Sequence, residues 1–280
     1  MRLALACLLW AGGLGAQSPR LAGPSRADSL IAQGRLAAAE AALYAASDAK
    51  PRDPAARGAL AAYLASRGRF SIALVLFDEA QRFGAAASRV NLARAAIRPY
   101  TRAAAAGPEV TLPWRGSPAP GLLGSITVRA REDSASSVQV QIDPNATGLV
   151  AGVGVAARLG LRRGDALPAL WLGTRRLGDV PVRVDSALGV DDARLGLDLL
   201  WALEPLVDER AGTLTLGRRA PTASAAGATE IPWLLTFPGL QLVPRAGAPP
   251  LRIESAAGRA LLEGRRWQID TRRAVVRVER

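Results

Sequence analysis

The stretch Val138-Gln-Val-Gln-Ile-Asp143-Pro-Asn-Ala-Thr-Gly-Leu-Val150 decides how the second half of this chain folds. Apolar and polar residues alternate from Val138 to Ile142, which is the period of a half-buried β-strand. Asp143 follows directly, and the Pro, Asn, Thr and Gly residues after it are typical of tight turns. The sequence therefore predicts a strand that delivers one carboxylate to a turn.

Three further blocks follow this turn. They are a short helix at residues 155–161, a strand pair around residues 172–184, and Arg194-Leu-Gly196-Leu-Asp198-Leu-Leu200 with a closing hairpin after it. In this order and spacing, residues 138–216 resemble the retropepsin-like aspartic peptidases of the bacterial, exported kind. The usual turn of that family reads Asp-Thr-Gly-Ala.

The resemblance implies a mostly-β acid protease barrel at residues 123–219. It makes Asp143 the candidate catalytic carboxylate and assigns Gly196 and Asp198 to a structural helix behind the site. The chemistry of the family needs two carboxylates that share one proton and together activate a water. One retropepsin unit supplies only one of the two.

The turn of this chain departs from the family pattern at two positions. Pro144 has neither a backbone N–H nor the threonine hydroxyl that braces the two lobes in the family. Asn145 replaces glycine, and we expect it to take the left-handed conformation, since asparagine tolerates it best after glycine. Ala146 and Thr147 complete the turn. Three hypotheses remain for Asp143: a working or weakly working peptidase, a peptidase-like fold used for binding, and a plain turn aspartate.

A second carboxylate could come from a second copy of the chain or from the C-terminal segment. The block Gly196-Leu-Asp-Leu-Leu200 is echoed further along the chain by Gly258-Arg-Ala-Leu-Leu262. The same displacement relates residues 207–210 to 269–272 and residues 213–216 to 275–278. We therefore interpret residues 220–280 as a shortened, degenerate second lobe. In this second lobe, the position that corresponds to Asp143 is occupied by Thr236 or Phe237, so the lobe supplies no carboxylate there.

Residues 24–100 are rich in alanine and contain an internal repeat. The sequence Leu30-Ile-Ala-Gln-Gly34-Arg-Leu-Ala-Ala-Ala39 returns as Leu64-Ala-Ser-Arg-Gly68-Arg-Phe-Ser-Ile-Ala73. The spacing and the pattern resemble tetratricopeptide repeats, in which glycine permits the turn between helices and alanine permits close packing. A further helix is expected at residues 86–97. Residues 101–122, rich in Pro and Gly, are predicted to be a linker.

The N-terminus has the features of an export signal. A positive residue, an apolar run and a small-residue cleavage site occupy residues 1–16, and the run is too short to span a bilayer. Removal of this signal also removes Cys7, the only cysteine, and the chain has no histidine. Thiol chemistry and Ser-His-Asp catalysis are thereby excluded. The net charge of +12 comes from scattered arginines without interleaved aromatics, which argues against nucleic-acid binding.

The sequence predicts a multi-domain α + β chain: helical hairpins, then the acid protease barrel, with the C-terminal segment forming a single-chain pseudo-dimer as one alternative. We expect an exported aspartic peptidase-family protein, periplasmic or secreted, with weak or lost activity. The alternative is a non-catalytic scaffold that binds peptides or proteins. A polypeptide substrate or partner is expected, and a homodimer is possible. No cofactor, metal, nucleic acid or membrane span of the mature chain is expected.

Overall fold

The computed structural model describes residues 25–101, 108–117, 119–130, 137–161, 166–217, 227–237 and 239–279. The predicted export signal lies outside these residues, and the predicted linker is described only in part. The chain divides into two compact units, which we call the helical unit and the β unit. The helical unit comprises the chain up to Arg98 together with residues 232–237 and 241–251. The β unit comprises the remainder.

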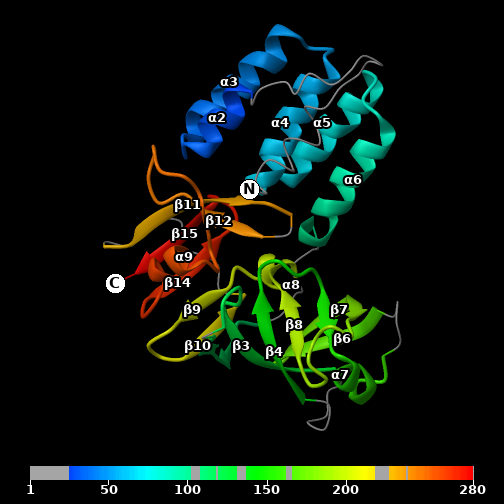
Figure 1. Ribbon diagram of the computed structural model, residues 1–280, viewed down its shortest axis with the longest axis vertical. Helices are drawn as coiled ribbons and strands as arrows, with labels where there is room; N and C mark the ends of the chain where they lie inside the picture. The colour runs from blue at the N-terminus through cyan, green and yellow to red at the C-terminus, as the bar shows by residue number, and fades with distance from the viewer. Residues whose placement is uncertain are drawn as a thin grey trace. The chain divides into compact units, whose positions relative to one another are not determined.

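Between residues 25 and 98 the helical unit has five helices that follow one another along the chain (Figure 1). Gly34 and Gly68 lie between the first and second and between the third and fourth helices, with φ of +65° and +74°. Both glycines adopt the left-handed conformation that ends a helix most easily without a Cβ atom. The helices are α2 (Arg26–Ala32), α3 (Leu36–Ala49), α4 (Pro54–Ser66), α5 (Phe70–Arg82) and α6 (Ala87–Ile97), and the short 3₁₀ helix η1 (Arg98–Thr101) follows them.

Part of the C-terminal third belongs to the helical unit. Leu234 and Val243 are buried against Leu36 of α3. A Cβ atom on Gly34 would lie 2.5 Å from the backbone oxygen of Ala248, so the glycine permits a close approach of the two segments. Arg67 places its guanidinium over the Trp233 ring. Residues 232–237 and 241–251 thus complete the helical unit, whereas the rest of the predicted second lobe lies in the β unit.

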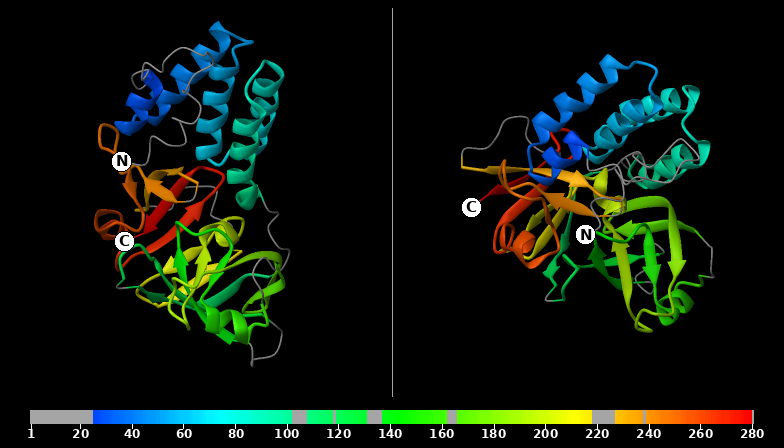
Figure 2. Two further views of the ribbon diagram at one scale, coloured as in Figure 1. Left: turned by 45° about the vertical axis from the view of Figure 1, so that its right-hand side comes forward. Right: turned by 45° about the horizontal axis from the view of Figure 1, so that its top comes forward.

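The β unit contains a closed barrel, which is the part of the predicted fold that the structure confirms (Figure 2). Its strands follow the order β3-β4-β8-β5-β7-β6, and a β3–β6 pairing at Arg129 and Trp171 closes the ring. Two pairings are parallel, β4 with β8 and β5 with β7. The strands are β3 (Gly124–Arg129), β4 (Ser137–Asp143), β5 (Leu149–Ala151), β6 (Ala166–Leu172), β7 (Arg175–Val184) and β8 (Ala193–Gly196), with helices α7 (Val153–Arg158) and α8 (Leu197–Trp201).

The segment interpreted as a linker also contains regular structure. Residues Val110–Pro113 form β1, which pairs antiparallel with β10 (Thr213–Leu216), and Arg115–Gly116 form β2, which pairs with β3. Leu112 is buried, and its neighbours Thr111 and Pro113 are exposed. Proline is tolerated here because β1 lies at the edge of its sheet. The Pro and Gly content of residues 101–122 predicted a linker, although the residues of β1 alternate between exposed and buried positions.

A second sheet joins two hairpins of the same design. Its order is β1-β10-β9-β14-β15-β11-β12-β13. In the first hairpin Thr213 lies opposite Asp208, and in the second Val275 lies opposite Asp270, so both partners are displaced by the interval that the sequence repeat predicts. The added strands are β9 (Leu206–Asp208), β11 (Thr229–Leu235), β12 (Leu240–Leu242), β13 (Leu251–Arg252), β14 (Arg266–Asp270) and β15 (Val275–Glu279), and helix α9 (Ala256–Ala260) precedes β14.

The two hairpins differ in what they bury. On the first, the hydroxyl groups of Thr111 and Thr215 lie 3.1 Å apart. In the second hairpin the position that corresponds to Thr215 is Arg277, which pairs with Glu230 of β11 at 3.7 Å. A neutral cross-strand contact in one half corresponds to an ion pair in the other.

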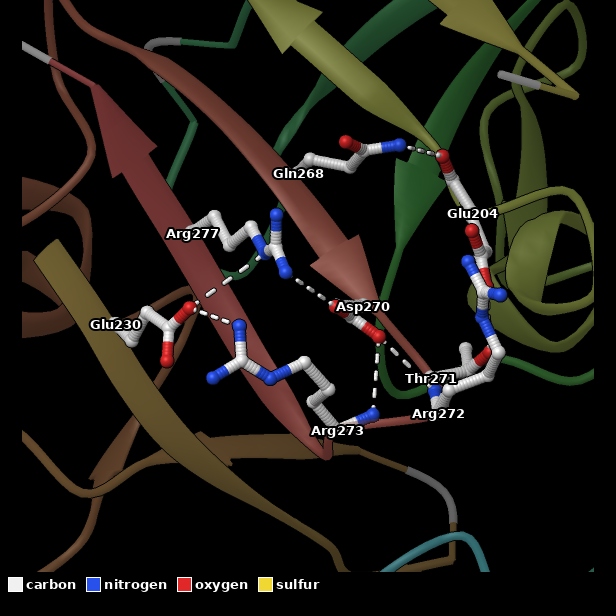
Figure 3. Close-up of polar contacts among 8 residues, drawn as sticks. All are labelled: Glu204, Glu230, Gln268, Asp270, Thr271, Arg272, Arg273 and Arg277. Atoms are coloured by element: carbon white, nitrogen blue, oxygen red, sulfur yellow. Dashed lines mark hydrogen bonds and ion pairs between the residues drawn. The ribbon is translucent and has the colours of Figure 1, made fainter. Parts of the chain in front are cut away.

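Arg277 belongs to a buried ionic cluster around the second hairpin (Figure 3). Its guanidinium lies 3.2 Å from the Asp270 carboxylate, and both side chains are almost completely buried. The other oxygen of Asp270 accepts hydrogen bonds from the backbone N–H groups of Arg272 and Arg273. Thr271 and Arg272 both contact the Glu204 carboxylate of the loop before β9. The hairpin turn is therefore fixed by a buried ion pair and by contacts of Thr271 and the more exposed Arg272 with Glu204.

We predict that Arg277→Ala lowers the free energy of unfolding by about 3–5 kcal/mol, because it leaves Asp270 buried without its cation. Urea unfolding followed by circular dichroism measures the loss. Arg158→Ala is the matched control. Arg158 pairs with Asp191 at the surface of the same unit, and its loss costs less than about 1 kcal/mol. Equal losses in the two variants would contradict the prediction.

Tyr63 supplies a test of the helical unit. Its hydroxyl donates to the Leu36 backbone oxygen at 2.9 Å, and burial raises its pKa to about 12. Because the unfolded chain loses this proton near pH 10, the stabilisation is complete below pH 10 and is lost as the pH rises through 12. We predict that Tyr63→Phe costs about 1 kcal/mol at pH 8 and reduces the loss of stability between pH 10 and 12.

Urea unfolding at pH 8 and at several pH values above 10 measures both effects. Tyr44→Phe is the control, since Tyr44 is exposed on α3 of the same unit. An unchanged alkaline dependence in Tyr63→Phe would show that this phenol does not link folding to pH.

Candidate functional site

Asp143 is the last residue of β4 and has an exposed fraction of only 6%. Its Oδ1 atom accepts a hydrogen bond from the Asn145 backbone N–H at 2.8 Å, and its backbone oxygen accepts one from Ala146 at 3.1 Å. These contacts close the turn directly after the strand. We call residues 143–148 the Asp turn.

The second oxygen of Asp143 is also occupied. Arg194 of β8 lies with its Nη1 atom 3.1 Å from Oδ2, and its own side chain is partly exposed. The contact follows from the parallel pairing of β4 with β8, which places Gln141 opposite Arg194 and Asp143 opposite Gly196. Arg194 lies just before Gly196 in the same sequence block, but nothing in that block marks it as a partner of Asp143. Both carboxylate oxygens of Asp143 therefore accept hydrogen bonds from protein groups, one of them charge-assisted.

Gly196 and Asp198 lie against the Asp turn. The Asp198 carboxylate is buried, and its Oδ1 atom accepts a hydrogen bond from the Gly148 N–H at 2.9 Å. The Gly196 N–H donates to the Gly148 oxygen at 2.7 Å. A Cβ atom on Gly196 would lie 2.2 Å from Asp198 Oδ1 and 2.7 Å from the Ala146 oxygen. Glycine is required here because the turn and helix α8 approach each other directly.

The remaining turn residues differ in exposure and conformation. Pro144 and Ala146 are buried, Asn145 is half-buried and Thr147 is exposed. The left-handed residue of the turn is Gly148, with φ of +67°. Asn145 does not have a positive φ, so the expectation of a left-handed asparagine is wrong. The left-handed backbone conformation occurs instead at Gly148, where the residue has no Cβ atom.

Asn145 instead uses its side-chain amide. The Nδ2 atom donates to Glu254 Oε1 at 3.1 Å, and Oδ1 accepts from Arg252 Nη2 at 2.5 Å. Arg252 Nε also lies 2.5 Å from Glu254 Oε1. Glu254 is buried, and nothing in the local sequence indicates that these two residues meet a turn so far back along the chain. The structure thus adds Arg194, Arg252 and Glu254 to the residues predicted for the site.

Thr236 and Phe237, the predicted counterpart of the Asp turn, belong to the helical unit. Phe237 has φ of +42° and packs against the apolar core of the helices. No carboxylate occupies either position in the sequence. Through Phe237, this segment contributes to the apolar core of the helical unit.

The described residues contain no group of three or more His, Cys, Asp or Glu side chains arranged to hold a metal ion. Within the same part of the chain, no helix combines the length and apolar character needed to cross a membrane. The site described above consists of carboxylates, guanidiniums and one amide.

Comparison with known proteins gives a likeness in structure but none in sequence. No protein-family model matches this chain, and no curated protein matches its sequence. A retropepsin-like aspartic protease from Rickettsia conorii matches in structure with 16% sequence identity and a TM-score of 0.30. The match covers 39% of this chain and 89% of the Rickettsia protein.

Proposed function

We propose that this chain is an exported, retropepsin-like member of the aspartic peptidase families that binds polypeptides and has lost most or all peptide-bond hydrolysis. The observation that carries the proposal is the ion pair between Asp143 and Arg194. The family assignment rests on the order and spacing of the sequence blocks and on the closed barrel that presents Asp143 at the end of β4.

Hydrolysis by this class of enzyme needs two carboxylates that share a proton and hold a water between them. Among the described residues, the side-chain oxygens of Asp143 contact one backbone N–H and one guanidinium, and neither partner is a carboxylate. A general base must lie within hydrogen-bond reach of the water that it deprotonates. Arg194 occupies Oδ2 and the Asn145 N–H occupies Oδ1, so both oxygens already have protein donors, which favours binding over catalysis.

The paired hairpins support the single-chain pseudo-dimer. Residues 206–216 and 266–279 form hairpins of the same register, and β9 pairs with β14 along its free edge. A second copy of the chain could not add a strand at β9 without displacing β14. This arrangement argues against the alternative in which a homodimer supplies a second Asp143.

The helical unit supports a role in recognition. Two helical hairpins with left-handed Gly34 and Gly68 fit tetratricopeptide-like repeats, which commonly present a surface to protein partners. Ile72 and Val75 lie one turn apart on α5 with exposed fractions of 51% and 57%. Exposed aliphatic side chains at this spacing form an apolar stripe on a helix, which suits contact with another polypeptide.

The proposal predicts no cleavage by the protein lacking residues 1–16. Reduced, carboxymethylated α-lactalbumin, an unfolded polypeptide, is incubated at acid pH with the wild type, Asp143→Asn and Arg194→Ala, and its fragments are measured by mass spectrometry. We expect all three proteins to cleave below about 10⁻³ of the rate of an active aspartic peptidase, because one carboxylate cannot supply the paired mechanism. Cleavage above this rate that pepstatin blocks and that Asp143→Asn abolishes would overturn the proposal.

Export is tested separately. The small-residue site at residues 14–16 predicts that the mature protein begins at or near Gln17. Mass spectrometry of the N-terminal peptide, from protein isolated from its native cell and fractionated into envelope and cytoplasm, provides the measurement. Retention of Met1 on most molecules would contradict export by this signal.

A further inference from the structure

We propose that Asn145, Arg252 and Glu254 form a clasp that holds the C-terminal segment of the chain on the Asp turn. We further propose that a polypeptide reaches this turn only when the clasp opens. The second statement rests on the proposed binding function, because it says how access of a polypeptide to that site is regulated.

The geometry of the clasp is a closed triangle. Each corner contacts the other two, with distances of 3.1 Å from Asn145 to Glu254, 2.5 Å from Arg252 to Asn145 and 2.5 Å from Arg252 to Glu254. Both polar atoms of the Asn145 amide are used. A glycine at this position, which has no side chain, could make neither contact.

Burial sets the strength of the clasp. The Glu254 side chain is only 5% exposed, whereas that of Arg252 is 56% exposed. Among the described residues, Glu254 Oε2 has no hydrogen-bond partner, so Oε1 makes every hydrogen bond of this carboxylate. Loss of one partner leaves a buried charge poorly compensated, which is strongly destabilising. The exposed arginine is the corner that solvent or a ligand can reach first.

The backbone that carries Arg252 and Glu254 is held firmly. Ile253, between them, is fully buried, and its N–H donates to the Leu240 oxygen at 2.9 Å. Helix α9 lies so close that a Cβ atom on Gly258 would be 2.1 Å from the Arg252 oxygen. Ser255 caps this helix through the Gly258 N–H. The two charged side chains are therefore presented from a fixed position, as a specific contact requires.

The chemistry of the clasp explains why a peptide would compete with it. The Asn145 amide offers N–H donors and a carbonyl acceptor, the two kinds of group with which a backbone peptide group pairs. An extended peptide added beside the Asp turn would supply a C=O for Nδ2 and an N–H for Oδ1. Glu254 and Arg252 now contact these two atoms. The C-terminal segment and an added peptide thus compete for the same amide.

The test uses Asn145→Ala, which removes the amide, and Glu254→Gln, which keeps the shape and removes the charge. Arg158→Ala is the control, because it breaks an exposed ion pair elsewhere in the same unit. Hydrogen exchange is measured at residues 143–148 and 251–260 of the full-length chain. We expect exchange in both segments to rise about tenfold in Asn145→Ala, to rise less in Glu254→Gln, and to stay unchanged in the control.

Binding is then measured by fluorescence anisotropy with fluorescein-labelled, carboxymethylated α-lactalbumin as the probe. We expect Glu254→Gln, which keeps the Asn145 amide, to bind the probe at least about fivefold more tightly than the wild type, and Asn145→Ala, which lacks the amide that the peptide would use, to bind it no more tightly than the wild type. Unchanged exchange in both clasp variants would overturn the clasp, even if the probe binds. Faster exchange without probe binding by any variant would overturn the gate together with the proposed function, and would leave the clasp as a structural contact. If Asn145→Ala fails to fold, Glu254→Gln decides the outcome.

Discussion

The parallel pairing of β4 with β8 is the constraint on which the rest of the site depends. It places the end of β4 beside Gly196, and the chain must then cross over the end of β8 to reach β5 on its other side. Such a crossing leaves backbone groups of the turn without strand partners. Asp198 and Gly196 solve this problem, since the Asp198 carboxylate and the Gly196 N–H satisfy the two backbone groups of Gly148. Without this pairing, the turn could not hold Asp143 in its buried position.

Arginine compensates the buried acids of the β unit. Asp143 pairs with Arg194, Glu254 with Arg252 and Asp270 with Arg277. In a chain with one lysine and no histidine, guanidinium is almost the only cation that can serve. Its flat, forked shape lets it contact several acceptors at once. The same pairing that stabilises the Asp143 carboxylate in the interior also occupies its Oδ2 atom.

The two hairpins of the second sheet share one register but differ in their outer contacts. Their registers are the same, and β1 and β11 flank them at corresponding places. The outer contact is a pair of threonines in one half and an arginine–glutamate pair in the other. Residues 232–237 and 241–251 pack with the helices, where Leu234, Phe237 and Val243 contribute apolar surface.

The sequence by itself determined the features that depend on neighbours along the chain. Alternation predicted β4, the Asp-Pro pattern predicted its turn, and the repeat that contains Gly34 and Gly68 predicted two helical hairpins, because strand period and left-handed glycine are local properties. Only the tertiary structure decided which side chains meet Asp143 and Asn145. Arg194, Arg252 and Glu254 come from distant segments of the chain. Such contacts leave no periodic signal, since they are set by strand order and by the need to pair charges that folding removes from water.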